Sequence, residues 1–223
     1  MRDVISVLIA EDQGLLRASL RALIDAEPGL TVVGAVADGD EAVALTRRER
    51  PDVVVMDIRM PGLDGIEATA RICADPDLAD TRVLVLTMFE LDDYVLGALR
   101  AGASGFLLKD ADPQVLVDAV RTIHSGQSLL GASVMTRLLA HSVPGGGTPG
   151  HLEGLTPRQR QVLMLIARGL SNSEIEEELG ITRATCRSHI TALLARLGAR
   201  DRAQLVIAAY ESGLVAPTAS HDH

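Results

Sequence analysis

The sequence is poor in aromatic side chains. It contains no tryptophan, two tyrosines and two phenylalanines among 223 residues, although 47% of its residues are hydrophobic. Aliphatic side chains must therefore fill the core. Cysteine is also scarce, since Cys73 and Cys186 lie far apart and form no CxxC pair. This spacing excludes a disulfide scaffold and indicates reduced, structural thiols in a cytosolic protein.

Long apolar runs are absent as well. The apolar stretch 4–10 is short and is followed at once by Glu11 and Asp12, unlike the core of a signal peptide. No segment approaches the roughly 20 consecutive apolar residues that a membrane-spanning helix needs. We therefore expect a cytoplasmic protein without a membrane partner.

Lysine is the rarest charged residue. Of 21 basic residues, 20 are arginines, and Lys109 is the one lysine. Lysine carries a compact ammonium and arginine a planar fork, so position 109 is predicted to need the ammonium. Charge is also uneven. Residues 1–126 hold 12 basic and 22 acidic residues, whereas 127–223 hold 9 and 8, which indicates two halves with different roles.

The most informative stretch is 53–65, which reads VVVMDIRMPGLDG. Four apolar residues predict a buried strand that ends on Asp57, followed by the turn signals Pro61-Gly62 and Asp64-Gly65. A carboxylate at the carboxyl end of such a strand lies where open α/β sheets bind ligands. On this stretch alone, a residue that merely starts a turn explains Asp57 equally well.

Strands and helices alternate through the first half. Apolar runs predict five strands, at 4–10, 31–36, 53–57, 82–87 and 105–109. Helical spacing or helix signals follow each strand, and they predict helices around 15–24, 42–45, 66–74, 92–100 and 113–124. We expect a doubly wound α/β domain with a five-stranded parallel sheet covered on both faces.

Four of these strands end in polar groups, which parallel strands place at one edge of the sheet. The groups are Glu11-Asp12, Asp57, Thr87 and Lys109. Three carboxylates together need a cation, and oxygen ligands of this number suit Mg²⁺. A hydroxyl and an ammonium opposite them would bind a tetrahedral anion attached to Asp57. The constellation predicts phosphoryl transfer to an aspartate.

With these residues, positions 1–126 resemble the receiver domain of two-component response regulators, a flavodoxin-like fold. The resemblance rests on Glu11-Asp12, MDIRMPGLDG, VLVLT and GFLLKD. It implies that Asp57 accepts a phosphoryl group from a histidine kinase. It also implies Mg²⁺ ligands at Glu11, Asp12, Asp57 and the backbone carbonyl of Arg59, with Thr87 and Lys109 at the phosphate. Phe106 takes the place of the switch aromatic, and Met88 is bulkier than the small residue usual after the threonine.

A second, smaller domain is expected after a linker. A short helix within 127–141 and the segment 141–154, rich in glycine and proline, form the predicted linker 127–154. Capping residues at Thr156, Ser171 and Thr182, with glycines at 169 and 180, then predict three helices in a helix-turn-helix arrangement. We place this all-α domain at 155–216 and a disordered tail at 217–223.

The third of these helices carries a basic surface. Cys186, Ile190, Leu193 and Leu197 form its core stripe, while residues 182–202 contain five arginines and one acid. A basic helix in a chain of net charge −9 points to nucleic acid, and Arg187 could pair with guanine in the major groove. A solvated charged face would be the default interpretation for a lone helix.

The segment from Leu155 to Val206 resembles a LuxR-type DNA-binding domain, and both halves together resemble a NarL/FixJ response regulator. The resemblance implies that Arg187, Ser188 and Thr191 face bases and that Asn172, Arg183 and His189 lie near phosphates. A last helix over 203–212 would serve dimer contacts. The departures from the family pattern are Gln159, Gln161, Glu176, Cys186 and Arg187. Because a carboxylate at 176 could repel DNA, we expect weak or dimer-dependent affinity.

The leading hypothesis is a transcription factor, not an enzyme, that phosphorylation of Asp57 by a sensor histidine kinase switches to a DNA-binding homodimer. A Mg²⁺-dependent phosphatase would want a second acid two residues after the first, where Arg59 stands. A dinucleotide-binding domain would want GxGxxG after the first strand, where AEDQG stands. A regulator that binds DNA constitutively keeps the fold but leaves the acidic groups and Lys109 without a role.

Overall fold

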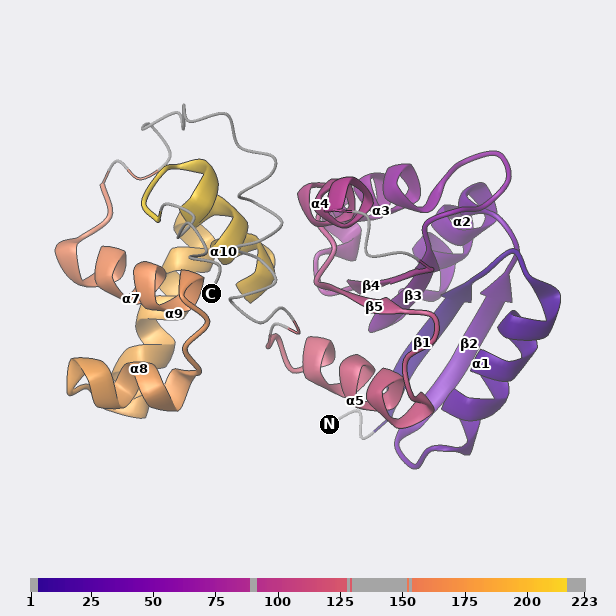
Figure 1. Ribbon diagram of the computed structural model, residues 1–223, viewed down its shortest axis with the longest axis horizontal. Coiled ribbons are helices and arrows are strands. Elements are labelled where there is room, and N and C mark those ends of the chain that lie inside the picture. The colour runs from indigo at the N-terminus through magenta and orange to yellow at the C-terminus, as the bar shows by residue number, and fades with distance from the viewer. Residues whose placement is uncertain (1–3, 89–91, 128, 130–151, 153, 216–223) are drawn as a thin grey trace, which may run out of the picture. The chain divides into compact units, whose positions relative to one another are not determined.

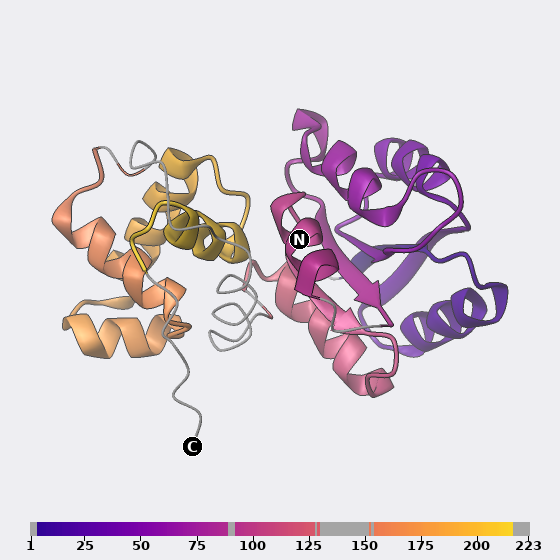
Figure 2. The ribbon, with the colours of Figure 1, turned by 45° about the horizontal axis from the view of Figure 1, so that its top comes forward.

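The computed structural model describes residues 4–88, 92–127, 129, 152 and 154–215. Its contacts divide the chain into two compact units, residues 1–129 and 130–223, drawn in Figures 1 and 2. The predicted helix within 127–141, the glycine-rich linker and the tail at 217–223 lie largely or wholly outside the described residues. The domain boundaries given above therefore stay a prediction.

The first unit is a five-stranded parallel sheet in the order β2-β1-β3-β4-β5. This order reverses direction between β1 and β3, so the crevice of the fold opens beyond the carboxyl ends of those two strands. The predicted doubly wound sheet is confirmed. Its strands are Ile5–Ala10 (β1), Leu30–Val36 (β2), Val53–Asp57 (β3), Arg82–Thr87 (β4) and Gly105–Leu108 (β5).

Helices cover both faces of this sheet. They are Gly14–Ala26 (α1), Gly39–Glu49 (α2), Gly65–Cys73 (α3), Asp92–Arg100 (α4) and Pro113–His124 (α5), with a short 3₁₀ turn at Pro76–Leu78 (η1) that the sequence analysis did not predict. Aspartates before α2, α3 and α5 accept hydrogen bonds from the first helical turn and so fix where each helix begins. The cap at Asp64 starts α3 at Gly65, one residue earlier than predicted.

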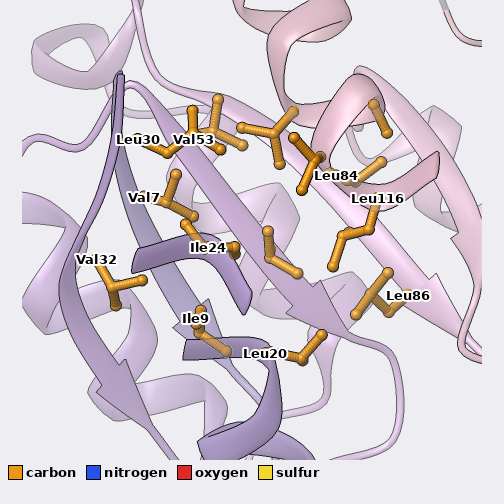
Figure 3. Close-up of a cluster of buried hydrophobic side chains, with 14 of the residues drawn as sticks. Val7, Ile9, Leu20, Ile24, Leu30, Val32, Val53, Leu84, Leu86 and Leu116 are labelled. Atoms are coloured by element: carbon orange, nitrogen blue, oxygen red, sulfur yellow. The ribbon is translucent and has the colours of Figure 1, made fainter. Parts of the chain in front are cut away.

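The core between the sheet and helices α1 and α5 is aliphatic, as the composition requires. Figure 3 shows alternate strand residues such as Val7, Val53 and Leu84 pointing toward Ile24 of α1 and Leu116 of α5. Burial on both faces explains why the first four residues of β3 are all apolar and lack alternation. A strand fixed in this way holds its last residue, Asp57, in a set position.

The second unit consists of four described helices. They are Pro157–Ala167 (α7), Asn172–Leu179 (α8), Arg183–Leu197 (α9) and Arg202–Glu211 (α10). Thr156 and Ser171 form capping boxes, Thr182 caps α9, and Gly180 ends α8 at φ 61°, a conformation that favours glycine. The predicted helix-turn-helix is therefore α8, a short turn and α9.

The predicted core stripe of α9 is borne out in part. Cys186 and Leu193 are buried, whereas Ile190 and Leu197 are half-buried. The apolar face of α7 is buried at five positions, which are Val162, Leu163, Leu165, Ile166 and Ala167. Within the part of the chain that the structure describes, no helix has both the length and the apolar character to cross a bilayer.

Candidate phosphoacceptor site and DNA-binding face

Three acids meet at the crevice between β1 and β3. Asp57 is the last residue of β3, and Glu11 and Asp12 directly follow β1. One carboxylate oxygen from each lies within 4.8 Å of the others. Glu11 and Asp57 are buried, at 0% and 3% exposure, whereas Asp12 faces solvent. Three predicted side chains from two separate strand ends are thus brought together.

Lys109 supplies the positive charge of this site. Its Nζ lies 2.7 Å from Asp57 Oδ2 and 2.8 Å from Glu11 Oε2, and it donates to Glu11 Oε1 at 3.0 Å. The lysine side chain is only 3% exposed. Strand β5 ends at Leu108, one residue before the predicted limit, and Lys109 N–H donates to the carbonyl of Thr87 at 2.9 Å. The end of β4 therefore fixes the backbone of the lysine.

Burial and neighbouring charges raise the pKa values of two side chains in this site, Glu11 and Lys109. Burial raises the pKa of the Glu11 carboxyl, the neighbouring Asp57 carboxylate raises it further, and the hydrogen bond from Lys109 opposes both without cancelling them. Burial by itself would lower the pKa of Lys109, but its hydrogen bonds to Asp57 and Glu11 outweigh that effect and raise the pKa. The ammonium thus stays charged while two carboxylates share it.

Backbone groups hold the same carboxylates. The N–H of Arg59 donates to Asp57 Oδ1 at 3.3 Å, and the N–H of Gln13 donates to Glu11 Oε1 at 3.2 Å. Arg59 itself is exposed, so its side chain is not part of the buried cluster. Gly65 packs so closely behind Asp57 that a Cβ there would lie 1.9 Å from the Asp57 carbonyl oxygen.

The other predicted switch residues flank this cluster. Thr87 is buried at the end of β4 and pairs in register with Leu108, next to Lys109. Phe106 lies in β5 and is half-buried. Met88, the departure after the threonine, is 61% exposed, so its bulk extends into solvent rather than into the core.

One residue of this site, Arg17 of α1, was not predicted from the sequence. Its Nη1 donates to the carbonyl oxygens of Glu11 at 2.6 Å and Asp12 at 3.2 Å. The guanidinium therefore ties the loop that presents both acids. The available signal was an arginine one turn into the helix after an acidic pair, but its targets are backbone atoms that the sequence does not single out.

The acidic cluster has the chemistry of a divalent-cation site. Oε2 of Glu11 is buried and accepts no hydrogen bond from the described residues, although the lysine ammonium lies beside it. Carboxylate and carbonyl oxygens are the ligands that Mg²⁺ takes in proteins. The residues present therefore fit such an ion.

One face of α9 presents the predicted base-contacting residues. Arg183, Arg187, Ser188 and Thr191 are all exposed and line the same open face of the helix. Small residues lie between them: Ala184, Ala192 and Ala195. His189 is half-buried, and Asn172 is exposed at the first position of α8. An exposed face with arginines and small side chains can approach a duplex closely.

The basic segment predicted over 182–202 needs a correction. Arg200 and Arg202 are half-buried, and Arg202 donates hydrogen bonds to the Asn172 side chain and to the carbonyl of Leu170. The positive charge counted along the sequence therefore overstates the charge on the exposed face, because both arginines are partly buried and Arg202 turns toward the segment before α8. Glu176 is half-buried, and its charge adds to the burial that raises the pKa of the Cys186 thiol.

Two family models match the chain along most of its length. Residues 7–121 match the response regulator receiver domain, and residues 153–209 match the luxR family of bacterial regulatory proteins. The transcriptional regulatory protein LiaR of Bacillus subtilis is 39% identical over 212 residues, covering 95% of this chain and 100% of LiaR. The chain belongs to the LuxR-type two-component response regulators.

Other response regulators agree with this assignment. VraR of Staphylococcus aureus is 34% identical over 95% of this chain and 99% of its own. Among solved structures, the response regulator ChrA of a heme-sensing two-component system is 32% identical, covers 96% of this chain and 100% of its own, and has a TM-score of 0.51. The receiver domain of a putative NarL regulator from Mycobacterium tuberculosis is 34% identical, with a TM-score of 0.54 over 56% of this chain and 99% of its own.

Proposed function

We propose that this response regulator is phosphorylated on Asp57 by a sensor histidine kinase and that the phosphoryl group promotes dimerisation and DNA binding. One observation supports it most: Asp57, Glu11 and Lys109 converge from three strand ends into one buried cluster. An ammonium that faces a buried carboxylate can exchange that contact for one with a phosphoryl oxygen, because both arrangements pair opposite charges.

Each residue then has a defined part in the transfer. Oδ1 of Asp57 is held by the Arg59 N–H, and Oδ2, which lies against Lys109, is the nearer oxygen to the compensating charge. Lys109 would stay at the site and pair with the incoming phosphoryl oxygen. Thr87, buried beside it, would donate its hydroxyl to another oxygen, and Phe106 would follow that change.

Glu11, Asp12, Asp57 and the carbonyl of Arg59 would hold Mg²⁺, and the bound ion would neutralise charge on the phosphoryl oxygens. Arg17 would keep the loop of Glu11 and Asp12 in place through their carbonyl groups. The chain itself supplies the acceptor, the ammonium and the hydroxyl, so it assists its own phosphorylation and dephosphorylation without acting as an enzyme on other substrates. A cytoplasmic location stays a prediction.

In the second unit, Arg187, Ser188 and Thr191 would read bases in the major groove, with Arg183, His189 and Asn172 at the phosphates. The exposed face of α9 supports this assignment. A dimer would place two such helices on half-sites about one helical turn apart. Since the half-buried Glu176 of α8 brings a carboxylate into the helix-turn-helix, affinity is expected to be weak or dimer-dependent. Nanomolar binding by an isolated, monomeric fragment 150–223 would contradict that expectation.

The test is selection of duplexes from a random pool by the purified full-length protein, with and without acetyl phosphate, for wild type and Asp57→Ala. The expected result is enrichment that increases with acetyl phosphate in the wild type and does not change in the variant. Equal binding in every condition would leave a constitutive DNA-binding protein and contradict the switch.

A further inference from the structure

Arg202 connects three parts of the DNA-binding unit. It is the first residue of α10, and it turns toward the segment between α7 and α8. Its Nη1 donates to Oδ1 of Asn172 at 2.8 Å, and its Nη2 donates to the carbonyl oxygen of Leu170. Asn172 is the first residue of α8. One guanidinium therefore joins the beginning of α10 to the beginning of the helix-turn-helix.

This contact determines the orientation of the Asn172 side chain. A carboxamide has an oxygen that only accepts and a nitrogen that only donates, and the two ends can exchange places by rotation. A guanidinium has five donors and no acceptor, so only the amide oxygen can face it. The Nδ2 group must then point away from Arg202. Because Asn172 is exposed, its two N–H donors are available to an acceptor outside the unit.

We propose that Arg202 is a positioning residue that holds the Asn172 carboxamide with its N–H donors toward a DNA phosphate. This inference rests on the proposed function, in which Asn172 lies near the phosphates. Without Arg202, the amide could rotate and present its oxygen, which repels a phosphate. In this role Arg202 acts through Asn172 and not by binding the duplex itself, since Nη1 and Nη2 are directed to Asn172 and Leu170.

The decisive variant is Asn172→Asp. Aspartate keeps an acceptor for Arg202 and is favourable in the first turn of a helix, so the unit should remain folded with an unchanged or higher Tm. It removes both N–H donors and adds a negative charge. We expect it to lower affinity for the duplex selected above by roughly 10- to 100-fold, and by more than Asn172→Ala does.

Gln161→Glu is the matched control. Gln161 Oε1 accepts from Arg158 Nη1 at 3.0 Å, so this change also converts an amide beside an arginine into a carboxylate in the same unit. It adds the same charge on α7 and leaves the first position of α8 unchanged. Its affinity should stay within about threefold of wild type, since exposed charge pairs contribute little.

Arg202→Met and Arg202→Lys test the positioning role. Arg202→Met should weaken binding roughly tenfold in the wild-type background and have no further effect in the Asn172→Ala background, because the arginine acts through the amide. The slope of log K against log salt should stay unchanged, because no phosphate charge is lost. In Arg202→Lys, the lysine ammonium can still donate to the amide oxygen of Asn172, so affinity should be higher than in Arg202→Met. This variant guards against a folding defect in Arg202→Met.

Three results would overturn the inference. The first is wild-type affinity in Asn172→Asp, which would make Asn172 only a structural acceptor. The second is an equal loss from Arg202→Met in both backgrounds, and the third is a salt slope reduced by about 0.9, which would mark Arg202 as a direct phosphate contact. A wild-type protein that binds no duplex would overturn the proposed function together with this inference. The three results above leave phosphorylation-controlled DNA binding intact, although the first removes Asn172 from the residues at the phosphates.

Discussion

Replacing Lys109 with methionine removes the ammonium while keeping most of the side-chain volume. Glu11 and Asp57 would then face each other without a cation in a site where their exposures are 0% and 3%. Removing one partner from a buried ion pair typically destabilises a protein by about 3–5 kcal/mol, because the other charge is left uncompensated. With a urea m-value of about 2 kcal/mol/M, the midpoint should fall by roughly 2 M.

Because the chain has two compact units, the assay must report on the first alone. Hydrogen exchange of peptides from β3, followed by mass spectrometry along a urea series in EDTA, meets this need. Arg121→Met is the control, since Arg121 pairs with Glu27 at 3.2 Å but is 40% exposed. Loss of that partly exposed pair should reduce stability by no more than about 1 kcal/mol.

The same variant tests the ion site. If Mg²⁺ binds the three acids, it should stabilise Lys109→Met more than wild type, because the acids then gain the only nearby cation among the described residues. At 100 times its Kd, a ligand adds about 2.7 kcal/mol to folding stability. A Lys109→Met protein that is no less stable than Arg121→Met, or whose stability ignores Mg²⁺, would refute the reasoning.

Three further predictions address the site and its surroundings. Burial raises the pKa of Glu11, so Glu11 favours folding below its unfolded value of 4.5, and this contribution is lost as pH rises through the higher folded value. Unfolding curves in EDTA should therefore show Glu11→Gln gaining stability relative to wild type as pH rises above 4.5, and the opposite trend would argue against the buried carboxylate. Gly65→Ala should destabilise the first unit and slow phosphorylation by acetyl phosphate, because its Cβ would lie 1.9 Å from the Asp57 carbonyl oxygen. The control Gly97→Ala, whose Cβ would have its nearest contact at 3.3 Å to Ile66, should change stability by less than about 1 kcal/mol. Equal effects of the two variants in urea unfolding would be inconsistent with the packing behind Asp57. In the native protein a thiol reagent should label Cys73 before Cys186, because Cys186 is fully buried and burial raises the pKa of its thiol. Mass spectrometry that found the reverse order of labelling would contradict the packing of α9.

The sequence predicted the sheet and its strand ends well for physical reasons. The strand at 53–57 is buried on both faces, so its continuous apolar run has few other interpretations. Parallel strands place Asp57 and Lys109 at one edge whatever the details of packing, and the single lysine drew attention to its position. The capping residues of α7, α8 and α9 act locally, so their roles could be assigned from spacing alone.

The parts that escaped prediction depend on tertiary placement. Arg17 binds backbone carbonyls, and Arg202 binds a backbone carbonyl and an amide thirty residues earlier in the chain. Neither target carries a pattern in the sequence. An arginine in a basic segment looks the same whether it faces a duplex or a neighbouring helix, which is why the charge count over 182–202 included Arg202 without distinguishing it.

The most direct measurement is the mass of the Asp57 peptide after the full-length protein is treated with acetyl phosphate and Mg²⁺. The account predicts one phosphoryl group on that peptide in the wild type, released by hydroxylamine as expected for an acyl phosphate, and none in Asp57→Asn or in EDTA. A phosphoryl group elsewhere in the chain, or equal labelling of Asp57→Asn, would contradict it.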